Sequence, residues 1–317
     1  MITIKSLCEK LKKEKKVAIF SHVRPDGDTV GSTLALKLAL EKLGIVADVY
    51  CEEGIPPKYS FIKGVLDYKN QLSGEYSAFI ALDCADPQRL GVFAVDFLSK
   101  NNTYNVDHHV SNVGYAKFNY VKCSSSNCEN IFDIIKELSV PLDEDIATAL
   151  ATGVVSDTGN FKHKNVQSET FSVASELKSA GADFNLIINK AFQEQSKQRA
   201  KLFGTVMNKI RYFLGDRLAV ASVLDSDLKN SGARPDETEG FIDFVMGIDV
   251  VEVGVCILET GKNKFKCSFR SKGVNVNEIA LTFGGGGHVL ASGCQIQGEY
   301  EEVVDKIRYA VHQHLPE

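Results

Sequence analysis

The stretch KVAIFSHVRPDGD, residues 16–28, joins a short apolar run to a tight turn that carries His22, Asp26 and Asp28. The run KVAIF has the length and the β-rich composition of a buried strand. Two carboxylates this close repel each other, by about 1 kcal/mol at 4 Å in water and by about 4 kcal/mol in a partly buried site. The turn needs neither carboxylate for folding, so the sequence predicts that a cation binds there.

Three further apolar runs follow in the first half of the chain, and each ends in polar residues. They are VADVYCEE (46–53), YSAFIALDC (76–84) and NTYNVDHH (102–109), and a helical pattern from Thr29 to Leu43 precedes them. Apolar strands that alternate with helical stretches indicate a parallel sheet covered by helices on both faces. In such α/β folds, ligands bind beyond the carboxyl ends of the strands.

The second half of the chain changes character twice. Charged, helix-prone segments continue from about Ser168 to Phe213, and short β-like runs begin at Leu218 and lead to a final helix over 299–315. We therefore expect an α/β fold in three parts. These are a parallel-sheet domain over 1–187, a helical connector over 188–214 and a smaller mixed α/β domain over 215–317.

Composition and charge exclude several classes of protein. No run approaches the ~18 apolar residues of a membrane helix, and the basic N-terminus lacks the apolar core of a signal peptide, so no membrane partner is expected. The eight cysteines form no CxxC pair, which disfavours disulfides and thiolate zinc sites and favours a cytoplasmic location. The net charge of −5 argues against binding of long duplex nucleic acid, although a local basic patch could hold a small anion.

Four acidic motifs lie at strand or helix ends in the first domain. Besides the opening turn, ALDCAD places Asp83 at the end of a strand, and VVSDTGNF supplies Asp157. NVDHH adds Asp107, His108 and His109 at the end of another strand. If the sheet is parallel, all four motifs reach the same edge. Carboxylates and imidazoles without a thiolate are the ligand set of Mn²⁺, Mg²⁺ or a similar ion.

So many acidic groups exceed the need of one ion. Two metals about 3.5–4 Å apart would neutralise them better, with Asp26 and Asp28 facing different cations. Each motif also has an ordinary structural explanation: Asp28 could cap the helix that starts at Thr29, Asp157 could shape a turn, and the histidine pair could be an exposed loop. The convergence of four motifs on one edge favours the metal site.

The C-terminal domain carries the stretch FGGGGHVLASG, residues 283–293. Consecutive glycines let backbone N–H groups approach an anion closely, and His288 follows at once. The neighbouring segment 262–272 contains five basic residues and no acidic one, and its alternation gives one basic face and one mostly apolar face. A flexible loop and an edge strand guarded by lysines are the ordinary explanations. Arg270 is the best candidate for a fork that binds phosphate.

These motifs resemble those of a known group. HVRPDGD, LDCAD, VDHH and SDTGNF are similar to the four motifs of the DHH phosphoesterase superfamily. FRSK, VNVNEIA, FGGGGH and ASG, in this order, are similar to its associated C-terminal domain. The resemblance spans nearly the whole chain, and the combination on a chain of this length resembles the nanoRNase and pAp-phosphatase type.

The resemblance implies a metal-binding role for six side chains. His22 and Asp26 would hold one divalent ion, and Asp83 would bridge both ions. The second ion would be held by Asp28, His108 and Asp157. The resemblance implies Mn²⁺ as the most favoured ion, with Mg²⁺ or Co²⁺ as alternatives.

Further roles follow from the same resemblance. Asp107 would orient a histidine, and His109 would contact the scissile phosphate or the leaving oxygen. The substrate's terminal nucleotide or phosphate would be bound by residues of the C-terminal domain, namely Arg270, Ser271, Gly285, Gly286, Gly287 and His288.

The predicted reaction is hydrolysis of a phosphoester bond. Two divalent ions lower the pKa of a bridging water toward about 7, and the resulting hydroxide attacks phosphorus in line with the leaving oxygen. The resemblance implies a phosphodiesterase of very short RNA oligonucleotides that could also remove the 3′-phosphate of pAp. Three alternatives stay open: a phosphodiesterase of cyclic dinucleotides or linear pApA, an inorganic pyrophosphatase, and a non-catalytic nucleotide sensor. The oligomeric state is also open, a homodimer included.

Overall fold

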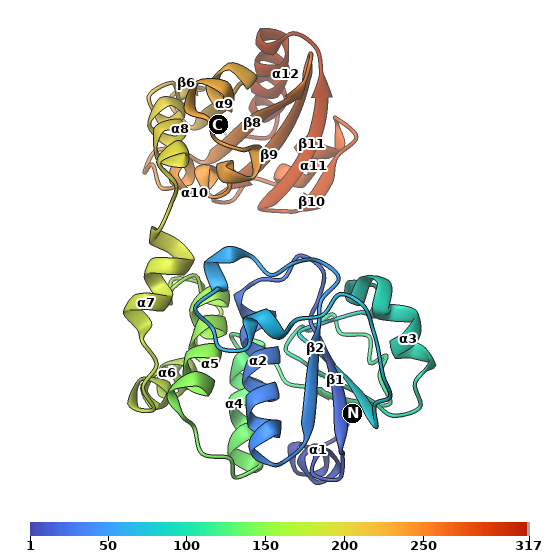
Figure 1. Cartoon of the computed structure of the whole chain (residues 1–317). Helices are drawn as coiled ribbons and strands as arrows, with labels where there is room; N and C mark the ends of the chain where they lie inside the picture. The colour runs from blue at the N-terminus through green and yellow to red at the C-terminus, as the bar shows by residue number, and fades with distance from the viewer. Residues whose placement is uncertain (316–317) are drawn as a thin grey trace. The chain divides into compact units, whose positions relative to one another are not determined.

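The computed structural model describes residues 1–315 and divides into two compact units (Figure 1). The first unit runs from Met1 to Glu194, and the second begins at Gln195. Each unit has its own sheet and its own buried apolar clusters. The α/β fold expected from the sequence is confirmed, with a parallel sheet in the first unit and a mixed sheet in the second.

The sheet of the first unit has five strands, all parallel, in the order β2-β1-β3-β4-β5. Because parallel neighbours run in one direction, the carboxyl ends of these strands lie at one edge of the sheet. The strands are β1 (Lys16–Phe20), β2 (Val46–Tyr50), β3 (Ala78–Leu82), β4 (Thr103–Asp107) and β5 (Phe118–Val121).

Helices cover both faces of this sheet, as the apolar runs predict (Figure 1). In β1, Val17 and Ile19 pack into the cluster formed with the helices α2 and α4, whereas Ala18 and Phe20 pack on the opposite face. That opposite face is covered by α3 and the 3₁₀ turn before it. The helices of the unit are α1 (Ile4–Leu11), α2 (Gly27–Lys42), α3 (Ala94–Ser99), α4 (Asn127–Glu137), α5 (Glu144–Asp157), α6 (Ser168–Ser179) and α7 (Phe184–Ile188). Three 3₁₀ turns (Pro57–Tyr59, Val65–Asp67, Pro87–Phe93) and a π-helical turn (Asn189–Gln193) complete it.

Helix α2 is buried on nearly every side because it lies between the sheet and α5. Gly31 makes this approach close, since a Cβ there would overlap the carbonyl oxygen of Ala149 in α5. The packing matters for the site described below, because α5 ends at Asp157 while α2 begins beside Asp26 and Asp28.

The sheet of the second unit has six strands in the order β10-β11-β9-β8-β7-β6, and only β7 and β8 pair in parallel. Its strands are β6 (Arg211–Phe213), β7 (Leu218–Val223), β8 (Val253–Gly261), β9 (Lys264–Ser271), β10 (Gly286–His288) and β11 (Ala291–Gln297). Its helices are α8 (Lys197–Met207), α9 (Asp225–Ser231), α10 (Phe241–Met246), α11 (Val276–Leu281) and α12 (Tyr300–His312), with a 3₁₀ turn at Pro235–Thr238.

The helical stretch expected up to Phe213 ends earlier than predicted. Helix α8 ends at Met207 and packs on β7 and α9, and residues 211–213 form a strand that pairs antiparallel with β7. The hairpin turn explains the difference, because Leu214, Gly215 and Asp216 all have left-handed φ angles that a helix cannot contain. Within residues 1–315, no helix is both long and apolar enough to cross a membrane.

Candidate metal centre and active site

The turn after β1 brings His22 and Asp26 together at the carboxyl edge of the sheet. Asp26 is the N-cap of α2: its Oδ1 accepts hydrogen bonds from the N–H groups of Asp28 (3.0 Å) and Thr29 (3.1 Å). The cap is therefore Asp26, not Asp28, which leaves the Asp28 side chain free for another role. The second oxygen of Asp26 lies 3.6 Å from Nε2 of His22.

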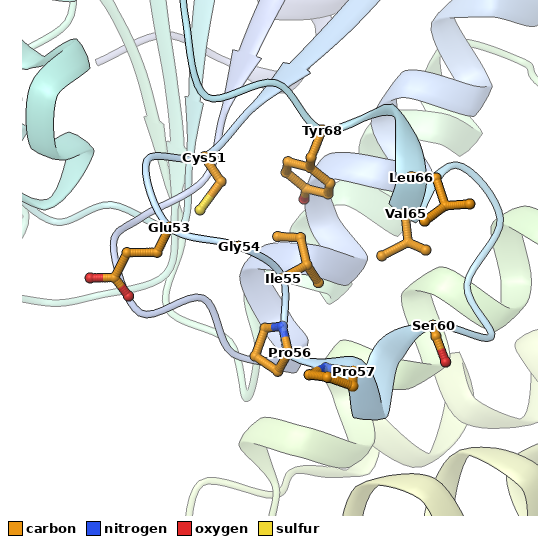
Figure 2. A pocket seen from close by; sticks show the side chains of 10 residues that line it. All are labelled: Cys51, Glu53, Gly54, Ile55, Pro56, Pro57, Ser60, Val65, Leu66 and Tyr68. Carbon is orange, nitrogen blue, oxygen red and sulfur yellow. The ribbon is translucent and has the colours of Figure 1, made fainter.

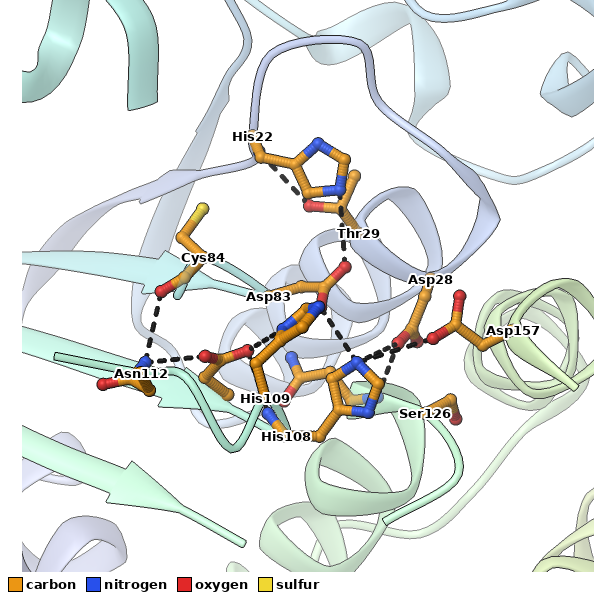
Figure 3. Close-up of polar contacts among 12 residues, drawn as sticks. His22, Asp28, Thr29, Asp83, Cys84, His108, His109, Asn112, Ser126 and Asp157 are labelled. Atoms are coloured by element: carbon orange, nitrogen blue, oxygen red, sulfur yellow. Dashed lines mark hydrogen bonds and ion pairs between the residues drawn. The ribbon is translucent and has the colours of Figure 1, made fainter. Parts of the chain in front are cut away.

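Asp83 follows β3 and stands at the centre of the cluster (Figure 3). Its Oδ2 lies 3.5 Å from Nε2 of His22, and its Oδ1 lies 3.4 Å from Nε2 of His108. The backbone of Asp83 has a left-handed φ of 58°, a strained conformation for a residue other than glycine. Although Asp83 is only 2% exposed, its Oδ1 and Nε2 of His108 find no hydrogen-bond partner among the described residues.

A second group forms around His108, which ends the β4 motif. Its Nε2 lies 3.8 Å from Oδ2 of Asp28 and 3.4 Å from Oδ2 of Asp157. Asp28 is fully buried, and its carboxylate accepts hydrogen bonds from the first N–H groups of α4, at Asn127 (2.5 Å) and Cys128 (2.9 Å). The positive end of the α4 dipole thus holds this carboxylate in place.

Helix α5 supplies Asp157 because α5 lies against α2. Gly153, one turn before Asp157, has no side chain, and a Cβ at this position would lie 2.6 Å from Oδ1 of Asp28. The helix can approach the cluster only because this position is glycine. The fourth acidic motif therefore reaches the site from a helix end, while Asp83 and His108 follow strands of the sheet.

Both histidines of the cluster are oriented by backbone carbonyls. Nδ1 of His22 lies 2.8 Å from the carbonyl oxygen of Val23, and Nδ1 of His108 lies 3.1 Å from that of Ser124. A carbonyl only accepts, so each ring donates from Nδ1, and a neutral ring turns the lone pair of Nε2 into the cluster. This arrangement is typical of histidines that bind metal ions.

The pKa values in the cluster show that its buried carboxylates repel one another. Burial, reinforced by the neighbouring carboxylates, raises the pKa of Asp157 to about 9 and that of Asp28 to about 7. Burial lowers the pKa of His22, but the facing carboxylates of Asp26 and Asp83 outweigh this effect and raise the pKa to about 10. With no cation, protons on Asp157 and His22 offset part of the negative charge.

The residues fit two divalent cations. One group of facing ligand atoms comprises His22, Asp26 and Asp83, and another comprises Asp28, His108 and Asp157. A third, overlapping group comprises Asp83, His108 and His109, and the atoms of each group lie within 4.8 Å of one another. The donors are carboxylate oxygen and imidazole nitrogen, the set that Mn²⁺ and Mg²⁺ prefer. The orphaned buried atoms of Asp83 and His108 supply an independent sign that a ligand is needed there.

His109 lies beside this cluster and is held by Asp107. The buried carboxylate of Asp107 accepts a hydrogen bond from Nδ1 of His109 (2.8 Å) and one from the backbone N–H of His108 (2.9 Å). The side chain of His109 is 42% exposed. The hydrogen bond to Asp107 raises the pKa of His109 despite its partial burial.

Asn112 completes this arrangement and was missed by the sequence analysis. Its side-chain amide donates to Oδ2 of Asp107 (2.6 Å) and to Oδ1 of Asn105 (2.8 Å). In Figure 3, Asn112 lies on the opposite side of His109 from Asp28 and Asp157. The available signal was an amide five residues after Asp107 in VDHHVSN, but an asparagine in a polar loop has many ordinary explanations.

In the second unit, Arg270 and His288 come to the same face of the sheet. Both pair in register with Ala291, Arg270 from β9 and His288 from β10, and directly opposed residues point to one face. Ala291, which lies between them in the sheet, has a small side chain. Ser271 points to the opposite face, where its hydroxyl donates to the carbonyl of Val274 (2.5 Å).

The glycine run begins beside a cavity of about 410 Å³. Gly284, Gly285 and Lys266 line it, and Gly286 and Gly287 continue directly into the short exposed strand β10. Arg270 is half-buried, and its guanidinium donates to the carbonyl of Phe269. The glycine run of the candidate substrate-binding residues therefore forms an exposed surface.

The site combines buried carboxylates and histidines at the carboxyl edge of a parallel sheet, and a further histidine is held beside them by Asp107. This combination is that of a phosphoester hydrolase that uses divalent metal ions. The model for the DHH family, N-terminal domain, matches residues 16–154, and the model for the DHHA1 domain matches residues 215–315. The chain belongs to the DHH family, as its motifs predict.

Several relatives match over nearly their whole length. The bifunctional oligoribonuclease and PAP phosphatase NrnA of Thermus thermophilus is 32% identical over 308 residues, which cover 93% of this chain and 90% of that protein. The NrnA of Bacillus subtilis is 26% identical, covering 88% of this chain and 89% of that protein.

Solved structures confirm the fold. An exopolyphosphatase-related protein from Bacteroides fragilis superposes with a TM-score of 0.86 at 24% identity, covering 98% of this chain and 95% of that one. RecJ of Thermus thermophilus, solved with Mn²⁺, superposes with a TM-score of 0.55 at 13% identity, covering 99% of this chain and 55% of RecJ.

Proposed function

We propose that this protein is a phosphodiesterase that hydrolyses very short RNA oligonucleotides and also removes the 3′-phosphate of pAp. The observation that carries the proposal is the central position of Asp83, which faces both His22 and His108 and so belongs to both groups of metal ligands. The names of the relatives that match nearly the whole chain support the same substrates.

In this proposal, His22 and Asp26 would hold one divalent ion, and Asp28, His108 and Asp157 would hold the other. Asp83, which faces both groups, would contribute to each. Mn²⁺ is the ion we expect, and Mg²⁺ or Co²⁺ are the alternatives. When bound, such ions lower the pKa of a water molecule and neutralise charge on the phosphoryl oxygens.

His109 acts on the leaving oxygen. Asp107 fixes the ring through Nδ1, which leaves Nε2 for the substrate, and the side chain is 42% exposed. The raised pKa of His109 favours a protonated ring that can donate a proton to the leaving oxygen. Asp107 is a positioning residue because it acts through His109, and Asn112 supports it by donating to its other carboxylate oxygen.

The C-terminal residues bind the phosphate or the terminal nucleotide. Arg270 supplies a planar fork for phosphate oxygens, and His288 lies on the same face of the sheet. The glycine run Gly285–Gly287 presents backbone N–H groups without side chains in the way. Ser271 would need to leave its hydrogen bond with Val274 to take part. A cytoplasmic location also belongs to the proposal, and all eight cysteines are free thiols.

The test is hydrolysis with Mn²⁺ of four substrates in parallel: pApA, a cyclic dinucleotide, pAp and pyrophosphate. We expect fast cleavage of pApA and slower release of phosphate from pAp. Turnover of the cyclic dinucleotide or of pyrophosphate alone would contradict the proposed substrates. No turnover of any substrate by metal-loaded protein would favour a nucleotide sensor instead.

A further inference from the structure

A cavity of about 360 Å³ lies in the first unit, outside the metal centre. It opens between the segment that follows β2 and the 3₁₀ turn Val65–Asp67 (Figure 2). Its volume falls within the usual range for small-molecule sites of about 300–1,000 Å³. The lining residues used below are Cys51, Glu53, Ile55, Val65, Leu66 and Tyr68.

Hydrogen bonds join this cavity to the loop that carries the metal ligands. The thiol of Cys51 donates to the carbonyl oxygen of His22 (3.7 Å), and a carboxylate oxygen of Glu53 accepts from the N–H of Arg24 (3.1 Å). Strands β1 and β2 are parallel neighbours, so the loops that follow them lie at the same edge of the sheet. The cavity therefore adjoins the side of the metal centre formed by His22.

Tyr68 gives the cavity a fixed aromatic wall. Its hydroxyl forms a hydrogen bond with the hydroxyl of Thr33 in α2, and Lys69, the next residue, pairs with Tyr50 at the end of β2. Figure 2 shows the ring of Tyr68 facing the side chain of Ile55. An anchored ring offers a flat apolar surface at little cost in conformational entropy.

The charges around the cavity define what it can bind. None of its lining residues is basic, and its single charged group, the Glu53 carboxylate, is turned away from Tyr68 and Ile55 (Figure 2). A phosphate would meet no cation there and would lie near this carboxylate. At the rim, Leu66 is 94% exposed and adds an apolar surface that solvent can reach. The cavity suits a neutral, flat group with apolar faces.

We propose that this cavity binds the base of the nucleotide attached to the scissile phosphate. The inference rests on the proposed function, because a short RNA contains one neutral flat group for each phosphate, separated from it only by the ribose. A base held by Tyr68, Ile55 and Leu66 fixes the nucleotide on the His22 side of the metal centre. Stacking on apolar and aromatic side chains does not depend on which base is present, so the site accepts any short sequence.

The first test measures binding without catalysis. The chain contains no tryptophan, so Leu66→Trp creates a single fluorescent reporter at the rim of the cavity. With EDTA present, we expect adenosine and AMP to quench this fluorescence and ribose 5-phosphate, which has no base, to leave it unchanged. Val95→Trp is the matched control, because Val95 is a 78% exposed apolar residue in α3, away from the cavity.

Three results would overturn the inference: no quenching by adenosine, equal quenching by ribose 5-phosphate, or equal quenching of the Val95→Trp control. Quenching of a Val110→Trp reporter in place of Leu66→Trp would also overturn it. Val110 lies in a separate surface pocket beside His109, and such a result would place the base there.

The second test separates this inference from the proposed function. Leu66→Ser should raise KM for pApA roughly tenfold, a size typical for the loss of one stacking contact, and should raise KM much less for a dinucleotide that lacks its bases. Val95→Ser should leave both values unchanged. If the wild-type protein does not cleave pApA, the proposed function fails, whereas adenosine binding still tests the cavity. If pApA is cleaved and Leu66→Ser leaves KM unaltered, the inference about the cavity fails alone.

Discussion

The metal centre and the glycine loop are both marked by short sequence motifs, yet the structure builds them in opposite ways. Asp28, Asp83 and Asp107 are buried, and Asp28 and Asp107 are held by hydrogen-bond donors before any substrate arrives. Gly286–His288 form a three-residue strand that is exposed along its whole length. Groups that stabilise a developing charge must be oriented in advance, whereas groups that admit a substrate must stay accessible.

The largest expected effect comes from Asp83→Asn. Asparagine tolerates the left-handed φ of Asp83, so the backbone should keep its conformation, but the amide removes the negative charge that faces both histidines. We expect kcat to fall on the order of 1,000-fold or more, beyond the roughly 10- to 100-fold loss typical for residues that only orient a ligand. Steady-state hydrolysis of pApA measures the effect, and circular dichroism checks the fold.

Asp86→Asn is the matched control, because it makes the same change three residues later in the same loop. Asp86 caps the following 3₁₀ turn by accepting from the N–H of Gln88 and Arg89, and asparagine caps equally well. Its activity should remain close to that of the wild type. Near-normal turnover by Asp83→Asn would contradict the central role of Asp83 in holding the metal ions.

Removal of metal should have the next largest effect. It should destabilise the region around the metal centre and leave the glycine loop unchanged. An ion that binds the folded state at about 100 times its Kd stabilises it by about 2.7 kcal/mol. For a unit of this size, EDTA should therefore lower Tm by about 5–10 °C. Hydrogen exchange should become faster around Asp28, Asp83 and His108, whereas 286–293 should be unaffected. Equal changes in both regions would mean that the glycine loop is coupled to the metal centre.

The same comparison separates what the sequence could predict from what it could not. Strands that end in Asp83 and His108 were predictable, because a parallel sheet brings its strand ends to one edge whatever the details of packing. The position of Asp157 was less secure, since it depends on how closely α5 approaches α2, and this is decided by the absence of a side chain at Gly153. Close packing between helices is a tertiary effect that no local pattern records.

Other features depended on contacts between distant residues. Asn112 orients Asp107 through one amide hydrogen bond, and the cavity beside Tyr68 arises where two loops meet, so neither leaves a periodic signal. In the second unit, Arg270 and Ser271 are neighbours in sequence, but a strand turns successive side chains to opposite faces. The alternation in the sequence already placed Ser271 on the mostly apolar face, and only the family resemblance grouped it with Arg270.

The smallest effect we predict tests whether substrate binding in the second unit depends on the backbone conformation of the glycine run. Gly287 has a φ of 151°, and a Cβ there would lie 2.6 Å from the carbonyl oxygen of Ala291 and 2.7 Å from Cα of Ser292. Gly287→Ala should therefore distort the β10–β11 hairpin at a cost of about 1–3 kcal/mol. Since Arg270 and His288 are aligned through Ala291, we expect KM for pApA to rise roughly tenfold, the equivalent of about 1.4 kcal/mol, with little change in kcat.

Gly273→Ala provides the control for this change, because a Cβ at Gly273 would meet nothing within 4 Å and its φ is not in the left-handed region. Its KM should equal that of the wild type. If Gly287→Ala instead lowers kcat and leaves KM unaltered, the hairpin contributes to the chemical step, and the distinction between an oriented metal centre and an accessible binding surface no longer holds. If both kinetic constants stay constant in both variants, the glycine run binds no part of the substrate, and Arg270 and His288 must act without it.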